Sequence, residues 1–147
     1  MNFALPEPEA VLFCCTLNAI RSPMAEGLTK SLVGTRLYVD SVGVRSKEAD
    51  GFMIEVMAEI GIDMRGHSPK NFDDLADGSF DLIIALSPEA QHHAVEMTRT
   101  MACEVEFWNT FDPSIIEGGR NMSLEAFRTV RDQLRQKIEK RFSRPSA

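Results

Sequence analysis

The strongest constraint in this sequence is an apolar run that leads directly into a loop and then into a helix. Residues 10–14 are all apolar, which predicts a buried strand. Ser22 and Pro23 are residue types preferred at the N-cap and in the first helical position, so we expect a helix to begin there. Cys15 therefore ends a strand, and Arg21 lies six positions later at the start of the helix.

A loop of this length between a strand and a helix can bind a tetrahedral oxyanion. Its backbone N–H groups can point to one centre, and the helix N-terminus adds unpaired donors and a partial positive charge. Arg21 would hold two oxygens with its planar guanidinium, and Cys15 would lie in line for attack on the central atom. These positive surroundings favour the thiolate, and the Ser22 hydroxyl can donate to it. The predicted oxyanion loop comprises Thr16, Leu17, Asn18, Ala19, Ile20, Arg21 and Ser22.

The stretch 11–26, VLFCCTLNAIRSPMAE, resembles the phosphate-binding loop of the low-molecular-weight protein tyrosine phosphatases, a family that includes related arsenate reductases. The resemblance continues, in the family's order, through residues 39–43, 61–67, 80–86 and 112–113. It implies an enzyme, a phosphomonoester hydrolase of the protein-tyrosine-phosphatase type, that works through a phosphocysteine intermediate. Cys15 would be the nucleophile, and Arg21 would bind the oxyanion.

Asp112 stands where this family has its general acid and base, in the sequence Phe111-Asp112-Pro113. An aspartate before a proline more often forms a turn, and it is the resemblance that makes Asp112 a predicted catalytic residue. The resemblance also implies a hydrogen-bond network that holds the loop in shape. Asparagine suits such a loop because it tolerates a left-handed backbone and its amide can bind neighbouring groups. The predicted network consists of Asn18, Ser22, Ser41 and His67.

Strands alternate with helices along the chain, which predicts an α/β fold with a parallel four-stranded sheet flanked by helices, a three-layer sandwich. The resemblance adds the Rossmann-like strand order 2-1-3-4. Ligands bind such sheets beyond the carboxyl ends of the strands, where Cys15 lies. The predicted strands are 10–14, 36–40, 80–86 and 104–108, and the predicted helices are 23–33, 49–60, 88–97 and 123–142.

The length of 147 residues predicts one domain, residues 1–147, with a loose lead-in at 1–9 and a frayed tail at 144–147. A formal net charge of −6 argues against a nucleic-acid partner. No run approaches the roughly 20 apolar residues of a membrane helix, and the N-terminus lacks a signal-peptide pattern, so we expect a cytoplasmic protein with no membrane partner. We expect no metal site and no cofactor.

The three cysteines do not form a secreted disulfide framework, because two of them are adjacent. Cys14 should face the opposite side of its strand from Cys15 and act as a small core residue. Cys103 is the only cysteine downstream of the loop. This bears on the nearest alternative function, arsenate reductase, because relatives with an internal thiol cascade have two cysteines there.

The sequence leaves two classes of substrate open: a phosphorylated protein, with phosphotyrosine as the modified residue, or a small phosphomonoester. In either case phosphate or another oxyanion would be the bound group. Leu17 and Ile20 replace a glycine and a second cysteine found in many relatives, and Ala19 replaces a larger aliphatic residue. Ser114 follows Asp-Pro, where an aromatic residue is common. Another alternative is therefore a catalytically weak oxyanion-binding regulatory module.

Two phenylalanines are candidates for the apolar wall that a phenyl ring would need. Residues 44–51 lack the aromatic residue that lines the phosphotyrosine slot in relatives. Phe52 or Phe111 could replace it.

Overall fold

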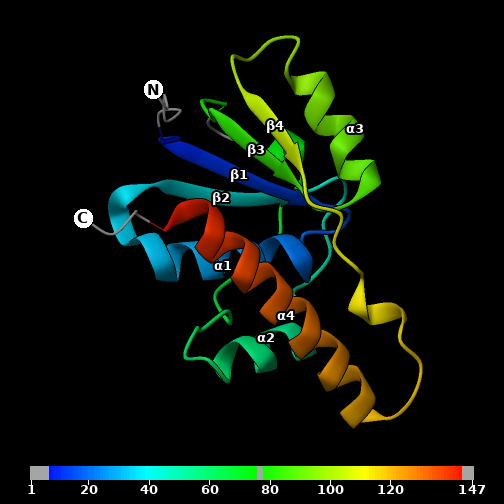
Figure 1. Cartoon of the computed structure of the whole chain (residues 1–147). Helices are drawn as coiled ribbons and strands as arrows, with labels where there is room; N and C mark the ends of the chain where they lie inside the picture. The colour runs from blue at the N-terminus through cyan, green and yellow to red at the C-terminus, as the bar shows by residue number, and fades with distance from the viewer. Residues whose placement is uncertain (1–6, 76–77, 144–147) are drawn as a thin grey trace.

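The computed structural model describes residues 7–75 and 78–143, and these form a four-stranded sheet flanked by helices. All neighbouring strands are parallel, and their order is β2-β1-β3-β4, which confirms the predicted fold and topology (Figure 1). The predicted tail and most of the predicted lead-in lie outside the described residues. The strands are β1 (Ala10–Cys15), β2 (Tyr38–Gly43), β3 (Leu82–Ala85) and β4 (Glu104–Phe107).

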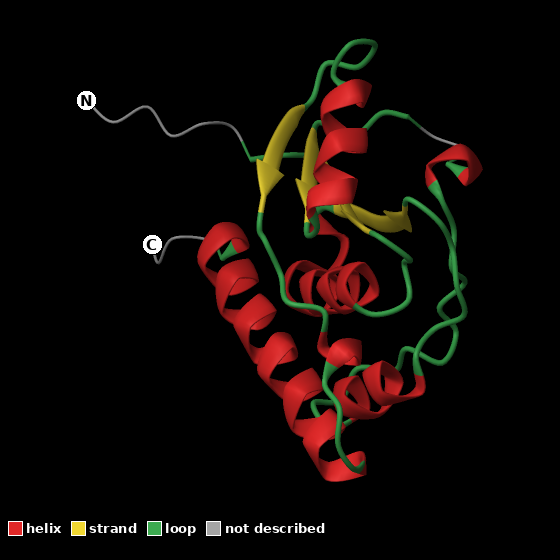
Figure 2. Cartoon of the chain, turned by 90° about the vertical axis from the view of Figure 1, so that its right-hand side faces the viewer, coloured by secondary structure: helices red, strands yellow, loops and turns green. Residues whose placement is uncertain are grey.

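Helices cover both faces of the sheet, as Figures 1 and 2 show. The third helix packs on one face, while the first and fourth pack together on the other and the second lies against the fourth. Among residues 7–75 and 78–143, no helix has both the length and the apolar character needed to cross a membrane. The helices are α1 (Arg21–Val33), α2 (Gly51–Ala58), α3 (Pro88–Met97) and α4 (Arg120–Phe142).

Alternating residues of β1 divide the core into two parts, because successive side chains of a strand face opposite sides of a sheet. Val11, Phe13 and Cys15 belong to the larger cluster, which includes buried residues of α1, α2 and α4. Leu12 and Cys14 belong to the smaller cluster, which includes buried residues of α3. Cys14 and Cys15 therefore lie on opposite faces of the sheet, as predicted.

The start of α1 differs from the prediction. The helix begins at Arg21, with Ile20 at the N-cap position and no side-chain cap. Ser22 was predicted as the N-cap, but it lies inside the first turn and is fully buried. Its hydroxyl is engaged with the loop instead of the helix end, and this explains why the cap prediction was wrong.

Several other boundaries differ by one or two residues, with β2 starting at Tyr38, α2 spanning Gly51–Ala58, β3 spanning Leu82–Ala85 and β4 ending at Phe107. Two larger differences have physical reasons. Strand β2 runs from Tyr38 to Gly43, beyond the predicted end at Asp40, because it pairs with β1 as far as Cys15. Helix α4 begins at Arg120, three residues before the predicted start. Its first turn is largely exposed and so carries no apolar periodicity for a sequence reading to detect.

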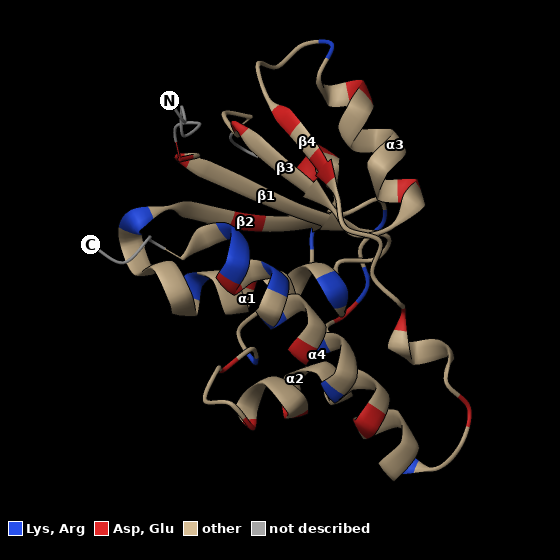
Figure 3. Cartoon of the chain, viewed as in Figure 1, with Lys and Arg blue, Asp and Glu red and all other residues tan. Residues whose placement is uncertain are grey.

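Charged side chains join α4 to the end of α2, and Figure 3 shows basic positions spaced along α4. Arg131 is 8% exposed, and its Nη1 donates to the Val56 carbonyl and to Glu59 Oε1, both at 2.8 Å. Arg128 Nη2 donates to Glu59 Oε2 at 2.7 Å. Hydrogen bonds from Arg128 and then from Arg131 lower the pKa of Glu59 from 4.5 to about 2.

We expect Glu59→Gln to lower the free energy of unfolding by about 1 kcal/mol at pH 7, the net value of hydrogen bonds to a partly exposed charge. Because the pKa of Glu59 is lower in the folded state, the stabilisation is complete above a pH of about 4.5. The stabilisation is lost as the pH falls towards about 2. Urea unfolding at pH 7 and pH 3 should therefore show a smaller difference between variant and wild type at pH 3. Glu125→Gln is the control, because Glu125 contacts Arg128 but not the buried Arg131.

Candidate active site

The predicted oxyanion loop joins the carboxyl end of β1 to the start of α1. Its residues 16–20 follow Cys15, which is 2% exposed, and precede Arg21. The loop therefore lies at the edge of the sheet where all four parallel strands end (Figure 1).

The segment 44–50, which follows β2, runs beside the loop and binds its carbonyl groups. Four backbone N–H groups of the segment donate to the carbonyl of Cys15 and to three loop carbonyls, at distances of 2.9–3.1 Å. Because the carbonyls are bound outside the loop, the amide groups are available on its inner side. Sequence reasoning missed this segment, since backbone donors have no residue signature. The pairs are Val44 to Cys15, Arg45 to Thr16, Lys47 to Leu17 and Asp50 to Ala19.

Asn18 is the point at which the loop turns. Its φ of 54° is positive, and it is the one non-glycine residue with positive φ in the described chain. Its Nδ2 donates to Ser22 Oγ at 2.8 Å and to Ser41 Oγ at 2.9 Å. Its Oδ1 accepts from the Lys70 N–H at 3.0 Å, and its carbonyl lies 3.1 Å from His67 Nε2. The structure thus brings together the four residues of the predicted network.

The Cys15 sulfur has two hydrogen-bond partners within the loop and first turn. Ser22 Oγ lies 2.9 Å from Sγ, and the Asn18 N–H donates to Sγ at 3.3 Å. Donors to a sulfur favour its charged form. The Ser22 hydroxyl and the Asn18 N–H are therefore both placed to hydrogen-bond the sulfur.

Arg21 is held at the loop by a partner that the sequence did not reveal. Its Nη1 donates to the Thr110 carbonyl at 3.1 Å, and its Nη2 donates to Thr16 Oγ1 at 3.4 Å. Thr16 in turn donates to Ser87 Oγ at 3.1 Å. Thr110 is 6% exposed and follows β4, so the loop after β4 helps to fix the guanidinium.

Asp112 lines the same cavity as Cys15. Its carboxylate Oδ1 accepts from the backbone N–H of Ser114 at 2.9 Å and from its hydroxyl at 2.7 Å, which is the turn geometry expected before Pro113. Cys15, Arg21 and Asp112 line one cavity of about 110 Å³. The remaining lining residues are Thr16, Leu17, Ala19, Ile20 and Ser114.

Neither phenylalanine considered for an apolar wall lines this cavity. The ring of Phe52 packs against Phe127, with centroids 5.5 Å apart, and the Arg120 guanidinium lies over it. Phe111 precedes Asp112 and is 48% exposed. Within the described residues, the lining is aliphatic and polar.

Neither of the other two cysteines lines this cavity. Burial raises the pKa of the Cys14 thiol, and the adjacent Cys15 adds to the effect. Burial also raises the pKa of Cys103, which directly precedes β4. In the ranges 7–75 and 78–143, no group of three or more His, Cys, Asp or Glu residues could hold a metal ion.

The parallel sheet, with a cysteine-containing loop at its carboxyl edge, places this chain among the α/β enzymes whose active sites follow a strand. The family model for low molecular weight phosphotyrosine protein phosphatase matches residues 10–144. The chain belongs to this family, and the resemblance inferred from the sequence is confirmed.

Curated relatives of similar length are named as arsenate reductases. The glutaredoxin arsenate reductase of Synechocystis sp. is 32% identical over 88% of this chain and 92% of its own length. An arsenate reductase of Staphylococcus aureus is 30% identical over 91% of this chain and 96% of its own length.

Solved structures include both kinds of enzyme. An arsenate reductase in a phosphate-binding state is 30% identical, with a TM-score of 0.70 over 90% of this chain and 95% of that one. A tyrosine phosphatase of Erwinia amylovora shares the fold, with a TM-score of 0.75 at 20% identity over 95% and 94% of the two chains. The comparisons therefore establish the family and leave phosphatase and arsenate reductase as its two activities.

We predict that Gly43→Ala distorts the oxyanion loop. A Cβ at Gly43 would lie 2.2 Å from the Arg45 carbonyl oxygen and 2.6 Å from the Asn18 nitrogen, both backbone atoms that cannot rotate away. We expect binding of inorganic phosphate, measured by calorimetry, to weaken by at least about tenfold, since overpacking costs about 1–3 kcal/mol. Gly51→Ala is the control, because nothing lies within 4 Å of its added Cβ. Equal phosphate affinity in the two variants would contradict the prediction.

Proposed function

We propose that this chain hydrolyses phosphomonoesters through a phosphocysteine intermediate. The observation that carries the proposal is that Cys15, Arg21 and Asp112 line the same small cavity. A nucleophile, an oxyanion-binding cation and a carboxyl group are the three groups that this chemistry requires. Phosphate is the oxyanion for which the loop is proposed, and no cofactor is needed for either step.

In the first step, the Cys15 thiolate attacks phosphorus and forms the sulfur–phosphorus bond. The bond from phosphorus to the ester oxygen breaks, and Asp112 gives its proton to the departing alcohol or phenol. Arg21 and the loop amides bind the non-bridging oxygens as their charge develops. The Ser22 hydroxyl, 2.9 Å from Sγ, stabilises the sulfur before attack and as it leaves in the second step.

In the second step, a water molecule attacks the phosphorus of phosphocysteine. Asp112, now a carboxylate, accepts a proton from this water, and the sulfur–phosphorus bond breaks. The products are inorganic phosphate, the Cys15 thiolate and a protonated Asp112. The catalyst is thereby returned to its starting state.

The position of Cys103 supports hydrolysis over arsenate reduction by an internal thiol cascade. Glu104 pairs with Leu82, which pairs with Val11, so Cys103 is level with the start of β1 while Cys15 is at its end. Five residues of strand separate these levels, which is about 16 Å along the strand direction. A disulfide requires Cα atoms within about 7 Å. An arsenate reductase of this geometry would need an external thiol.

The lining of the cavity bears on the substrate. Leu17, Ile20 and Ser114 line the cavity in which the phosphoryl group is proposed to bind, and they offer short aliphatic and polar side chains in place of an aromatic slot. We propose that the phosphoryl group is the main recognised element, carried by a phosphorylated protein side chain or a small phosphomonoester. The aliphatic wall favours substrates whose group next to phosphate is slender.

We expect Cys15→Ser to abolish phosphate release from an aryl phosphate, because a serine hydroxyl is a far weaker nucleophile than a thiolate. Asp112→Ala should lower kcat by about 10² to 10⁴, and the loss should be smaller for a phenol that leaves without protonation. Asp73→Ala, at an exposed aspartate outside the cavity, should leave kcat unchanged. Turnover that survives in Cys15→Ser would refute the mechanism. Tight phosphate binding with turnover indifferent to Asp112→Ala would instead identify an oxyanion-binding module.

Arsenate reductase is the second candidate because relatives 30–32% identical to this chain carry that name, one of them a glutaredoxin arsenate reductase. We predict that kcat/KM for phosphomonoester hydrolysis exceeds that for arsenite production when glutaredoxin and glutathione are supplied. The reverse order would assign the chain to arsenate reduction by an external thiol. In that case activity should persist in Cys103→Ser, since Cys103 lies too far from Cys15 to take part.

A further inference from the structure

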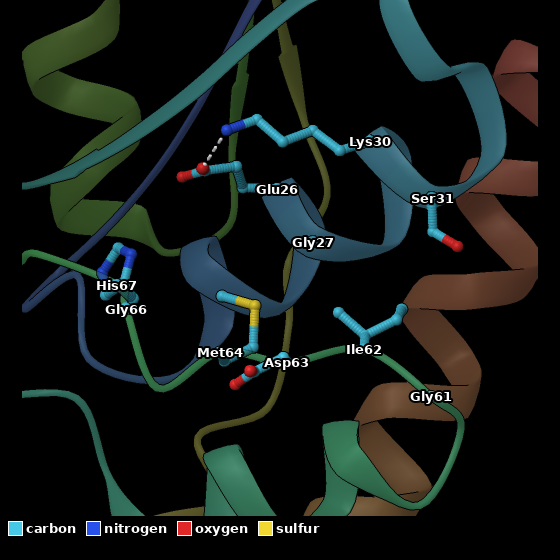
Figure 4. Close-up of a pocket in the computed structure, with 10 residues that line it drawn as sticks. All are labelled: Glu26, Gly27, Lys30, Ser31, Gly61, Ile62, Asp63, Met64, Gly66 and His67. Carbon is cyan, nitrogen blue, oxygen red and sulfur yellow. Dashed lines mark hydrogen bonds and ion pairs between the residues drawn. The ribbon is translucent and has the colours of Figure 1, made fainter.

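Glu26, on the second turn of α1, is connected to the active-site sulfur by a chain of hydrogen bonds that is part-buried at Glu26 and buried beyond it. Its carboxylate Oε1 accepts from Ser41 Oγ at 2.5 Å, and its Oε2 accepts from Lys30 Nζ at 2.6 Å. The Glu26 side chain is 13% exposed. Figure 4 shows this ion pair on the wall of a cavity of about 480 Å³, which His67 also lines.

The direction of each bond in this chain is fixed by the groups at its two ends. A carboxylate only accepts, so the single hydroxyl proton of Ser41 is directed to Glu26. The Lys70 backbone N–H only donates, so the Asn18 oxygen must face Lys70. The Asn18 amide group consequently presents both of its protons to Ser41 and Ser22, at 2.9 and 2.8 Å.

These directions determine where the Ser22 proton points. Ser22 Oγ already accepts from Asn18, so its own proton is left to donate. The acceptors within reach are Cys15 Sγ at 2.9 Å and the Val42 carbonyl at 3.3 Å. A thiolate at Cys15 is closer to the Ser22 hydroxyl than the Val42 carbonyl is, and it is charged, so the Ser22 proton is donated to the sulfur.

We propose that Glu26 is a positioning residue, whose carboxylate acts together with the Lys70 N–H to orient the Ser41–Asn18–Ser22 hydrogen bonds so that Ser22 donates to the nucleophile. The proposal rests on Cys15 as the nucleophile of the proposed function. It does not depend on which oxyanion is the substrate.

Reversing the first bond would oppose the other directions. If residue 26 donated to Ser41, the Ser41 proton would lose the carboxylate as its acceptor, and an Asn18 amide turned with its oxygen to Ser41 would restore one. In that arrangement the Lys70 N–H would lose its acceptor, and the Ser22 proton would be drawn from the sulfur to Asn18. Cys15 would keep only the 3.3 Å donor from the Asn18 backbone.

Glu26→Gln produces this reversal with almost no change of shape. The Lys30 ammonium attracts the amide oxygen of the glutamine, which leaves its NH₂ group facing Ser41. In Glu26→Gln/Lys30→Met that preference is removed, and the glutamine can turn its oxygen to Ser41. Lys30→Met alone retains the carboxylate–Ser41 bond. The double variant is therefore expected to rescue the effect of Glu26→Gln. Lys30 does not line the catalytic cavity.

Two readouts are measured for wild type and the three variants, with thermal unfolding to verify folding. The first is kcat/KM for an aryl phosphate. The second is the rate of alkylation of Cys15 by iodoacetamide at pH 6 and pH 9, which reports the sulfur independently of phosphatase activity. Arg21 and Asp112 are the charged residues lining the cavity of the sulfur, and they are unchanged throughout.

We expect Glu26→Gln to lower both kcat/KM and alkylation at pH 6 about tenfold, the value of one charge-assisted hydrogen bond. At pH 9 alkylation should approach the wild-type rate, because the thiol ionises in either case. The double variant should recover to within about threefold of wild type, and Lys30→Met should match wild type.

The proposal is overturned if Glu26→Gln alkylates like wild type at pH 6, or if the double variant is no faster than Glu26→Gln. Equal losses at pH 6 and pH 9 would indicate general distortion and would also overturn it. A Ser41→Ala background gives a separate test, because it has no hydroxyl proton to redirect; there, adding Glu26→Gln should change alkylation less than about twofold. If alkylation behaves as expected but no phosphatase activity is found, the proposed function fails and the positioning role stands.

Discussion

The loop that follows β1 can face an anion only because its carbonyl groups are bound elsewhere. Each peptide carries a donor and an acceptor on opposite edges, and an acceptor near the anion would cancel the donor's contribution. Residues 44–50 donate hydrogen bonds to three of these carbonyls and to that of Cys15, and Asn18 supplies the left-handed turn that brings an amide to the sulfur. The rest of the site depends on this arrangement, since the guanidinium and the carboxyl group are added around a loop already held in shape.

Gly43 shows how closely two segments distant in sequence have to approach for this purpose. It ends β2 opposite Cys15, where β1 ends, and its Cα faces backbone atoms of both the loop and the bracing segment. The requirement here is space and not backbone conformation, because Gly43 has no positive φ. The end of β2, the segment 44–50 and the oxyanion loop therefore meet at this glycine.

The alternation of strands and helices was predictable because buried strands and amphipathic helices leave clear apolar patterns. Cys15 and Arg21 were predictable because the strand, loop and helix signals follow one another in one register. Thr110, which anchors Arg21 through its carbonyl, had no signal, since a backbone acceptor carries no side-chain identity. The N-cap prediction for Ser22 failed for a related reason: local sequence suggested the helix end as its partner, whereas a tertiary contact with the sulfur prevailed.

The isolation of the three thiols has a consequence for oxidative damage. Peroxide that reaches a thiolate converts it to a sulfenic acid, which a nearby thiol can trap as a reversible disulfide. Cys14 points to the other face of the sheet, and Cys103 lies at its opposite edge. An oxidised Cys15 consequently has no partner among the described residues, and it would progress to the irreversible sulfinic acid unless a diffusible thiol reached it first. Retention of activity under peroxide would thus depend on the concentration of diffusible thiols and not on the other cysteines of the chain.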